Sequence, residues 1–204
     1  MVSDHELLDA WRAGDAQAGQ ELFTRHFDAA CRFFYNKADE GVDDLIQQTF
    51  LGCLESRERF RGDSSFFTFL IGVAKNVLRL HYRRKRRAER VDFGSTSVHD
   101  LSPSPSRVVA QQLDQQRVLQ ALRTIPLDLQ MVLELHYWEE LPASRIAEAL
   151  EIPPGTAKTR LRRGKQLLRE ELTRHEPTED ARSQLALTLD ERARGLRKLF
   201  PGGG

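Results

Sequence analysis

Residues 141–172 read LPASRIAEALEIPPGTAKTRLRRGKQLLREEL, and this stretch decides the fold. Its spacing predicts a helix over 143–150, a turn at EIPPG and a second helix from Thr156, with apolar side chains facing one another across the turn. Two helices joined by so short a turn, the second of them basic, are typical of a helix-turn-helix. A solvated basic helix in an ordinary bundle gives a similar pattern, and this stretch alone does not separate the two.

The second helix of this pair carries a polar face suited to DNA. Four side chains recur at i, i+1, i+4 and i+5 and share that face: Lys158, Thr159, Arg162 and Arg163. A helix-turn-helix inserts this end of its second helix into the major groove, where Arg reads guanine bidentately and Lys reads a base or binds phosphate. Arg160 and Lys165 lie to the sides, and we expect them to contact backbone phosphates.

The remainder of the chain also has helical periodicity, which predicts an all-α fold of two small helical domains joined by a flexible linker. In the first domain, the apolar stripes of the second and third helices include Phe27 and Leu54, and a fourth helix runs from Phe66 to about Arg86. Residues 91–106 are rich in Ser, Pro and Gly, as in a linker. The predicted divisions are 1–90, the linker 91–106, the helix-turn-helix domain 107–175, and a tail 176–204.

The tail could form an amphipathic helix, because Leu185, Leu189, Leu196 and Phe200 are roughly aligned, although Gly195 weakens it. Its role is open, and a frayed helical extension is an equal alternative to a regulatory or partner-binding segment.

Charge is segregated along the chain although the formal net charge is only +1. Residues 1–74 hold 7 Lys/Arg against 13 Asp/Glu, whereas residues 75–90 hold 8 against 1. The second range includes HYRRKRR at 81–87 and places four polar side chains on the expected exposed side of the fourth helix: Lys75, Asn76, Arg79 and Arg83. Cations with aromatic neighbours suit single-stranded or distorted nucleic acid, although core packing also explains the aromatic residues.

Other classes of protein have little support in the sequence. The opening MVSDHELL lacks the pattern of a secretory signal, and no apolar stretch is long enough to span a bilayer, so we expect a cytoplasmic protein without membrane insertion. Cys31 and Cys53 stand apart and are expected to be buried thiols. The histidines show no metal-ligand spacing and no phosphate loop or nucleophile motif is found, so neither a cofactor, a metal nor an enzymatic activity is expected.

The residues alone leave several binding functions open. The chain could be a helix-turn-helix regulator with an N-terminal sensor domain, or an RNA-binding or nucleoid protein without sequence preference. The exposed polar face of DDLIQQTFLGCLE, at 43–55, argues against a sensor, and the near-neutral total charge argues against nonspecific binding. A membrane patch is also disfavoured, because HYRRKRR continues a helix whose apolar face is needed for the core.

Two long stretches carry a family resemblance. Residues 43–87, DDLIQQTFLGCLESRERFRGDSSFFTFLIGVAKNVLRLHYRRKRR, and residues 125–172, beginning IPLDLQMVLELHYWEE, resemble an extracytoplasmic-function (group 4) sigma factor of bacterial RNA polymerase, in the sigma-70 family. With the helices preceding each, the resemblance covers roughly 5–172. It implies a promoter-specificity subunit without catalysis, whose partners are core RNA polymerase, promoter DNA and an anti-sigma factor.

The resemblance also implies roles for individual residues. The surface that docks on the clamp helices of the largest polymerase subunit corresponds to Asp44, Gln47, Gln48 and Leu51. Asn76 corresponds to an Asn that lines the pocket for a flipped base of the −10 element. Cations that would hold the DNA backbone there are Lys75, Arg79, Arg83, Arg84 and Arg86. The −35 element would be read by the second helix of the helix-turn-helix. The family often has Gly at the position of Glu140 and Ser or Thr at that of Pro142.

Overall fold

The computed structural model describes residues 2–57, 60, 64–85, 92–101, 113–174 and 179–199, with side chains from 114 and from 187 in the last two ranges. These residues are helical, without an extended strand, which confirms the predicted all-α class. The helices are α1 Asp4–Arg12, α2 Ala16–Tyr35, α3 Val42–Glu55, α4 Phe66–Lys85, α5 Val98–Leu101, α6 Leu113–Thr124, α7 Leu127–Tyr137, α8 Ala143–Leu150, α9 Pro154–Thr173, α10 Glu179–Gly195 and a final 3-10 turn, η2 Leu196–Leu199.

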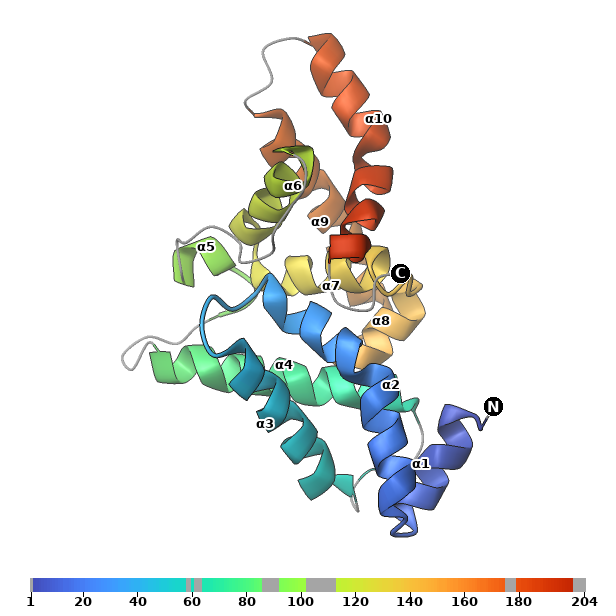
Figure 1. The fold of residues 1–204 in the computed structure, drawn as a ribbon. Coiled ribbons are helices and arrows are strands. Elements are labelled where there is room, and N and C mark those ends of the chain that lie inside the picture. The colour runs from blue at the N-terminus through green and yellow to red at the C-terminus, as the bar shows by residue number, and fades with distance from the viewer. Residues whose placement is uncertain are drawn as a thin grey trace.

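Helices α1 to α4 form the N-terminal half, in which α4 lies against α2 and α3 (Figure 1). Their boundaries follow local chemistry: the hydroxyl of Ser3 and the carboxylate of Glu6 form a capping box on α1, and Asp15 caps α2. Cys31 and Cys53 are buried free thiols, as predicted, and burial raises their pKa values to about 11 and about 12.

The helix-turn-helix consists of α8 and α9, packed on α7. Helix α8 has the predicted bounds, whereas α9 begins two residues before Thr156, because Pro154 takes the first helical position, where its fixed φ is favourable and its missing N–H costs nothing. At Gly164 a Cβ atom would lie 3.1 Å from Cγ of Leu133, so glycine lets α9 approach α7 closely.

The two halves share a continuous apolar core. Side chains of the N-terminal half, among them Phe34 and Ile71, belong to the same buried cluster as Met131, Leu135 and Ile146 of the C-terminal half. Helix α4 packs directly against α8 (Figure 1). The chain is therefore folded back on itself, with its two halves in contact.

Part of the predicted linker contributes to this core. Phe93, Val98 and Leu101 are buried, and the backbone N–H of Asp128 donates to the carbonyl of Phe93 over 2.9 Å. Residues 102–106 of the predicted linker lie outside the described residues. None of the helices in the described ranges has both the length and the apolar character required to cross a membrane.

Candidate nucleic-acid interface

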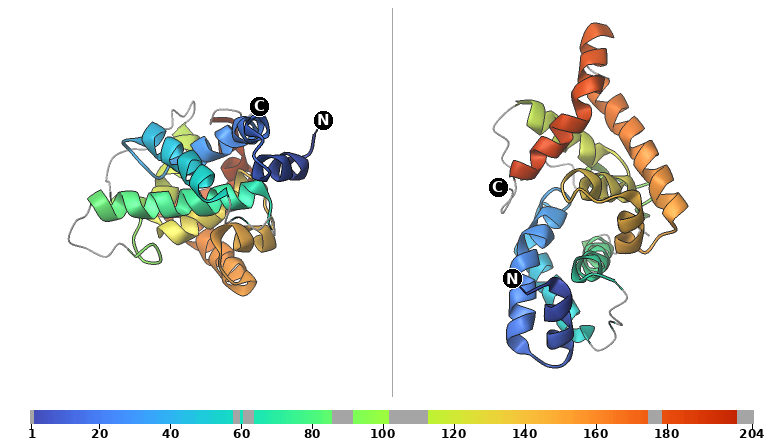
Figure 2. Two further views of the ribbon diagram at one scale, coloured as in Figure 1. Left: turned by 90° about the horizontal axis from the view of Figure 1, so that it is seen from below. Right: turned by 90° about the vertical axis from the view of Figure 1, so that its right-hand side faces the viewer.

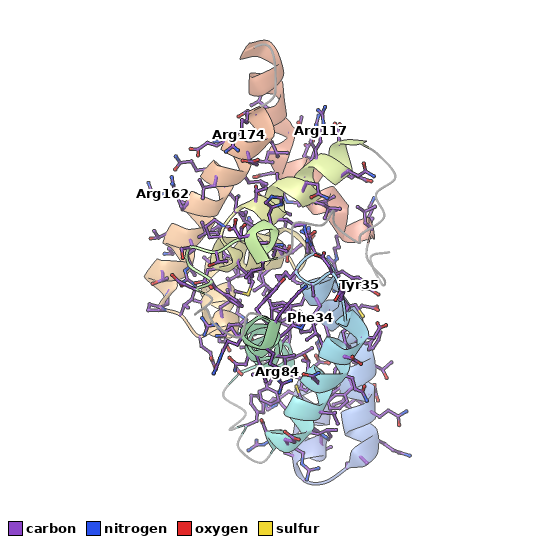
Figure 3. The ribbon with its side chains drawn as sticks, turned by 90° about the vertical axis from the view of Figure 1, so that its left-hand side faces the viewer. Phe34, Tyr35, Arg84, Arg117, Arg162 and Arg174 are labelled. Atoms are coloured by element: carbon purple, nitrogen blue, oxygen red, sulfur yellow. The ribbon has the colours of Figure 1, made fainter. Side chains whose placement is uncertain are left out.

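Helix α9 presents the predicted reading face to solvent. Lys158, Thr159, Arg162 and Arg163 are all exposed, and Arg162 points away from the body of the molecule (Figure 3). The opposite side of α9 holds Ala157 and Leu168, which are fully buried. Within the described part of the chain, no ion pair involves Lys158, Arg162 or Arg163. Their charges are therefore available to bases and phosphates.

The flanking cations of α9 are engaged inside the C-terminal half. Arg160 forms a 2.6 Å ion pair with Asp128, and Lys165 lies 3.5 Å from the carboxylate of Asp190 and over the ring of Tyr137. Their proposed phosphate contacts remain a prediction, and each would have to form in exchange for an internal contact.

Helix α4 presents a second basic surface. Asn76, Arg79, Arg83 and Arg84 are exposed, and Figure 3 views α4 nearly end-on from its C-terminus, where Arg84 lies. The guanidinium of Arg79 lies 5.4 Å from the ring centre of Phe93. Arg86 falls outside the described residues.

The expected exposure of Lys75 was wrong. Lys75 is 8% exposed, its Nζ donates to the carbonyl oxygen of Leu150 over 2.6 Å, and it lies 3.3 Å from the carboxylate of Glu151. The long side chain reaches the C-terminal end of α8, where unpaired carbonyls and the helix dipole favour a cation. Since these residues are 75 positions apart, the periodicity of α4 could not reveal the contact.

The residues expected to face polymerase share one side of α3. Asp44, Gln47, Gln48 and Leu51 are exposed there, with Leu51 exposed by 48%. Beside them runs an open groove of about 930 Å³ between α2 and α3. Phe27 and Leu54, which the apolar stripes placed in the core, are instead 47% and 46% exposed along this groove. The stripes were wider than the core they face, so periodicity alone did not separate core from groove.

Buried polar contacts join the two halves, and sequence reasoning missed them. Lys37 and Glu134 form a fully buried ion pair, Arg32 binds Glu139 at 2.6 and 3.0 Å, and Arg123 binds Asp39 at 2.8 and 3.0 Å. Burial lowers the pKa of Lys37 and raises that of Glu134, while their attraction opposes both shifts. The interface between the two halves therefore contains buried charged pairs as well as the shared apolar core.

Both basic surfaces fall within matches to known families. The model described as "Sigma-70 region 2" matches residues 22–88, and the model described as "Sigma-70, region 4" matches residues 115–168. The ECF RNA polymerase sigma-E factor of Haemophilus influenzae is 26% identical over 180 residues, which span 82% of this chain and 94% of that protein. The sigma-E factor of Escherichia coli is also 26% identical, over 82% of this chain and 93% of that protein.

Solved structures share the fold. CnrH, solved in complex with the cytosolic domain of CnrY, has a TM-score of 0.60 and 20% identity, over 85% of this chain and 99% of that chain. The sigma factor RpoE of Bartonella quintana, solved with the anti-sigma factor NepR, has a TM-score of 0.56 and 18% identity, over 77% of this chain and 97% of that chain.

The two family models together match more than half of the chain, and each covers one of the two basic helices. This confirms the resemblance seen in residues 43–87 and 125–172, and it leaves no room for a separate sensor domain over 22–88. The chain therefore belongs to the sigma-70 family of RNA polymerase sigma factors, in its extracytoplasmic-function group.

Proposed function

We propose that this protein acts in the cytoplasm, binds core RNA polymerase and directs transcription initiation at promoters with −10 and −35 elements. The observation that carries the proposal is the pair of exposed basic faces, on α4 and α9, one in each of the two matched regions. Such a factor is a binding subunit rather than an enzyme, and its specificity comes from base contacts while phosphate contacts position it.

The two halves divide the work. Residues 1–90 dock on the clamp helices of the largest polymerase subunit through the α3 surface and open the −10 element, with Asn76 holding a flipped base. Flipping costs a few kcal/mol of stacking, which a base pocket must offset. Residues 107–175 read the −35 element in the major groove, and residues 91–106 connect the two. The residues assigned to the −35 element are Lys158, Thr159, Arg160, Arg162, Arg163 and Lys165.

Binding both elements requires the halves to separate. Lys75 of α4 touches Leu150 of α8, whereas elements centred about 25 base pairs apart are separated by about 85 Å of B-DNA. The folded-back arrangement therefore represents the chain before it engages a promoter. Polar contacts such as Arg32 with Glu139 suit an interface that opens, because water can solvate the separated charges.

We also propose control by an anti-sigma factor. The two similar structures described above are complexes, one with the cytosolic domain of CnrY and one with the anti-sigma factor NepR. An anti-sigma factor that binds the folded-back arrangement more tightly than the open one would shift the equilibrium towards the folded-back arrangement, and so away from promoter binding. The shift is limited to the difference between its binding free energies for the two arrangements.

Reconstituted transcription tests the proposal. Core RNA polymerase is mixed with the purified chain and a library of fragments from the source genome, and the 5′ ends of transcripts are mapped. We expect discrete start sites that depend on the chain and share upstream sequence. The proposal would be contradicted if the transcripts were the same with and without the chain and the chain did not bind core polymerase.

A further inference from the structure

An exposed leucine lies on the basic face of α4. Leu80 is 39% exposed, and it shares this face with Asn76 and Arg83, because the three residues are spaced i, i+4 and i+7. The left-hand view of Figure 2 shows α4 lengthwise, with its C-terminal end extending beyond α2 and α3. Leu80 is therefore open to a partner that approaches the basic face.

The surroundings of Leu80 differ from those of the other exposed apolar residues. Arg83 and Arg84 follow it by one helical turn and are themselves exposed. By contrast, Phe27 and Leu54, exposed to a similar degree, lie together along the groove between α2 and α3. A partner for that groove must be apolar over a large area. A partner for Leu80 must instead combine anionic groups with a small apolar group.

Duplex DNA offers this combination in its major groove. Its phosphates are anionic, and the apolar group that its base pairs present at the edge of the major groove is the C5 methyl of thymine. The major groove is about 12 Å wide and admits an α-helix. A leucine among arginines on an exposed helix face therefore fits a thymine methyl between phosphates.

The order of side chains along α4 indicates where this thymine lies. The helical rise places Leu80 about 6 Å along the axis from Asn76, which is just under two base steps of about 3.4 Å, and it places Arg84 about 6 Å further. On the other side of Asn76, Phe69 lies against Phe60 with ring centres 4.5 Å apart. With the flipped base at Asn76 and the duplex phosphates at the arginines, Leu80 faces the duplex edge of the opened −10 element.

We propose that Leu80 is a specificity-determining residue, which selects thymine through its C5 methyl in the base pair on the duplex side of the flipped base. The inference rests on the proposed function and adds a residue to it. The leucine side chain has no hydrogen-bonding group, so it distinguishes thymine from uracil through the methyl group alone. Removing one such group from water strengthens binding by about fourfold.

The first experiment locates the thymine. Core polymerase with the wild-type chain or with Leu80→Ala transcribes a promoter library in which the −10 element and its upstream border are randomised, and the transcribed templates are sequenced. We expect wild type to enrich thymine at one base pair that borders the flipped base, and we expect Leu80→Ala, whose side chain is too short to reach it, to lose that enrichment. The same enrichment by both chains, or none by wild type, would overturn the proposal.

The second experiment removes the methyl group from the DNA. Promoters that carry thymine or deoxyuridine at that base pair compete for polymerase holding wild type, Leu80→Ala or Leu80→Met. Wild type and Leu80→Met, which retains an apolar side chain of similar length, should prefer thymine by about fourfold, whereas Leu80→Ala should bind both promoters equally. Leu187→Ala removes an exposed leucine of α10 and should match wild type. An equal preference in wild type and Leu80→Ala would overturn the proposal.

The wild-type chain separates this inference from the proposed function. If wild type directs no promoter-dependent initiation, the proposed function is refuted, and the assignment of Leu80 falls with it. If wild type initiates at promoters and its preference for thymine does not depend on Leu80, the assignment of Leu80 is refuted and the proposed function stands.

Discussion

The ammonium of Lys75 donates a hydrogen bond to the carbonyl oxygen of Leu150 over 2.6 Å, and so ties the helix assigned to the −10 element to the first helix of the helix-turn-helix. One cation thus serves the contact between the halves in the free chain and is assigned to DNA in the engaged chain. The same residue therefore reports whether the halves are together.

We predict that Lys75 reacts slowly with amine reagents in the free protein. Lys85, exposed at the end of the same helix, is the internal control. Because Lys75 is 8% exposed and hydrogen-bonded, its acetylation, followed by mass spectrometry, should be at least about tenfold slower than that of Lys85. Equal rates would mean that the halves are apart in solution.

Removing only one member of the buried Lys37–Glu134 pair should destabilise the protein. Lys37→Met leaves a buried carboxylate without its counter-ion, and we expect a loss of about 3–5 kcal/mol of unfolding free energy, measured by urea denaturation. The double variant Lys37→Met with Glu134→Leu should recover most of that loss, because it removes both desolvated charges. A double variant as unstable as the single one would show that the pair itself stabilises the fold.

The packing of α10 against the helix-turn-helix half should weaken in acid through Asp190. Burial raises the pKa of Asp190, but the Tyr137 hydroxyl and the Lys165 ammonium together hold it below the ordinary value of 3.8. Because packing of α10 lowers the pKa of Asp190, the stabilisation that this carboxylate gives is complete above pH 3.8. It is lost as the pH falls through the lower pKa of the packed state. Acrylamide quenching of Trp138, whose indole N–H donates to a backbone carbonyl of α10, should therefore rise with acid in a Trp11→Phe background. The rise should be smaller in Asp190→Asn, and identical profiles would contradict the prediction.

Helix α8 lacks a side-chain cap, and adding one should stabilise the protein. Pro142 precedes the helix with φ −69° and ψ 157°, a conformation that a capping serine adopts readily, yet it makes no capping hydrogen bond. We expect Pro142→Ser to raise the unfolding free energy by about 1 kcal/mol relative to Pro142→Ala, measured by urea denaturation. The alanine variant separates the cap from the loss of the proline ring, and equal stability of the two variants would rule out the cap.

Local chemistry explains what the sequence could predict. The bounds of α8 and the exposed face of α9 depend on neighbours within a few residues. The contact of Lys37 with Glu134 joins positions 97 apart, and it depends on how the halves fold together. For the same reason the composition of residues 91–106 indicated a linker, whereas Phe93 and Val98 are buried against partners that only the tertiary structure supplies.

Glu140 illustrates how a departure from the family pattern becomes interpretable with the structure. It has a φ of 53°, in the left-handed region that favours glycine, which the family often has at this position. Its carboxylate lies 3.9 Å from Arg197 of η2. The residue that replaces glycine thus faces the C-terminal segment, which lies outside both matched regions.

The reading face of α9 provides the sharpest test of the division of labour. Replacing Arg162 and Arg163 together by Ala removes two exposed charges and no ion pair within the described residues, so folding should be unaffected. Each lost base contact should cost about 1–3 kcal/mol of discrimination at the −35 element, measured by competition between matched and altered promoter fragments. Arg174→Ala, at the far end of the same helix region, is the control for loss of charge. Affinity for core polymerase should stay unchanged, and a parallel loss of core binding would refute separate roles for the two halves.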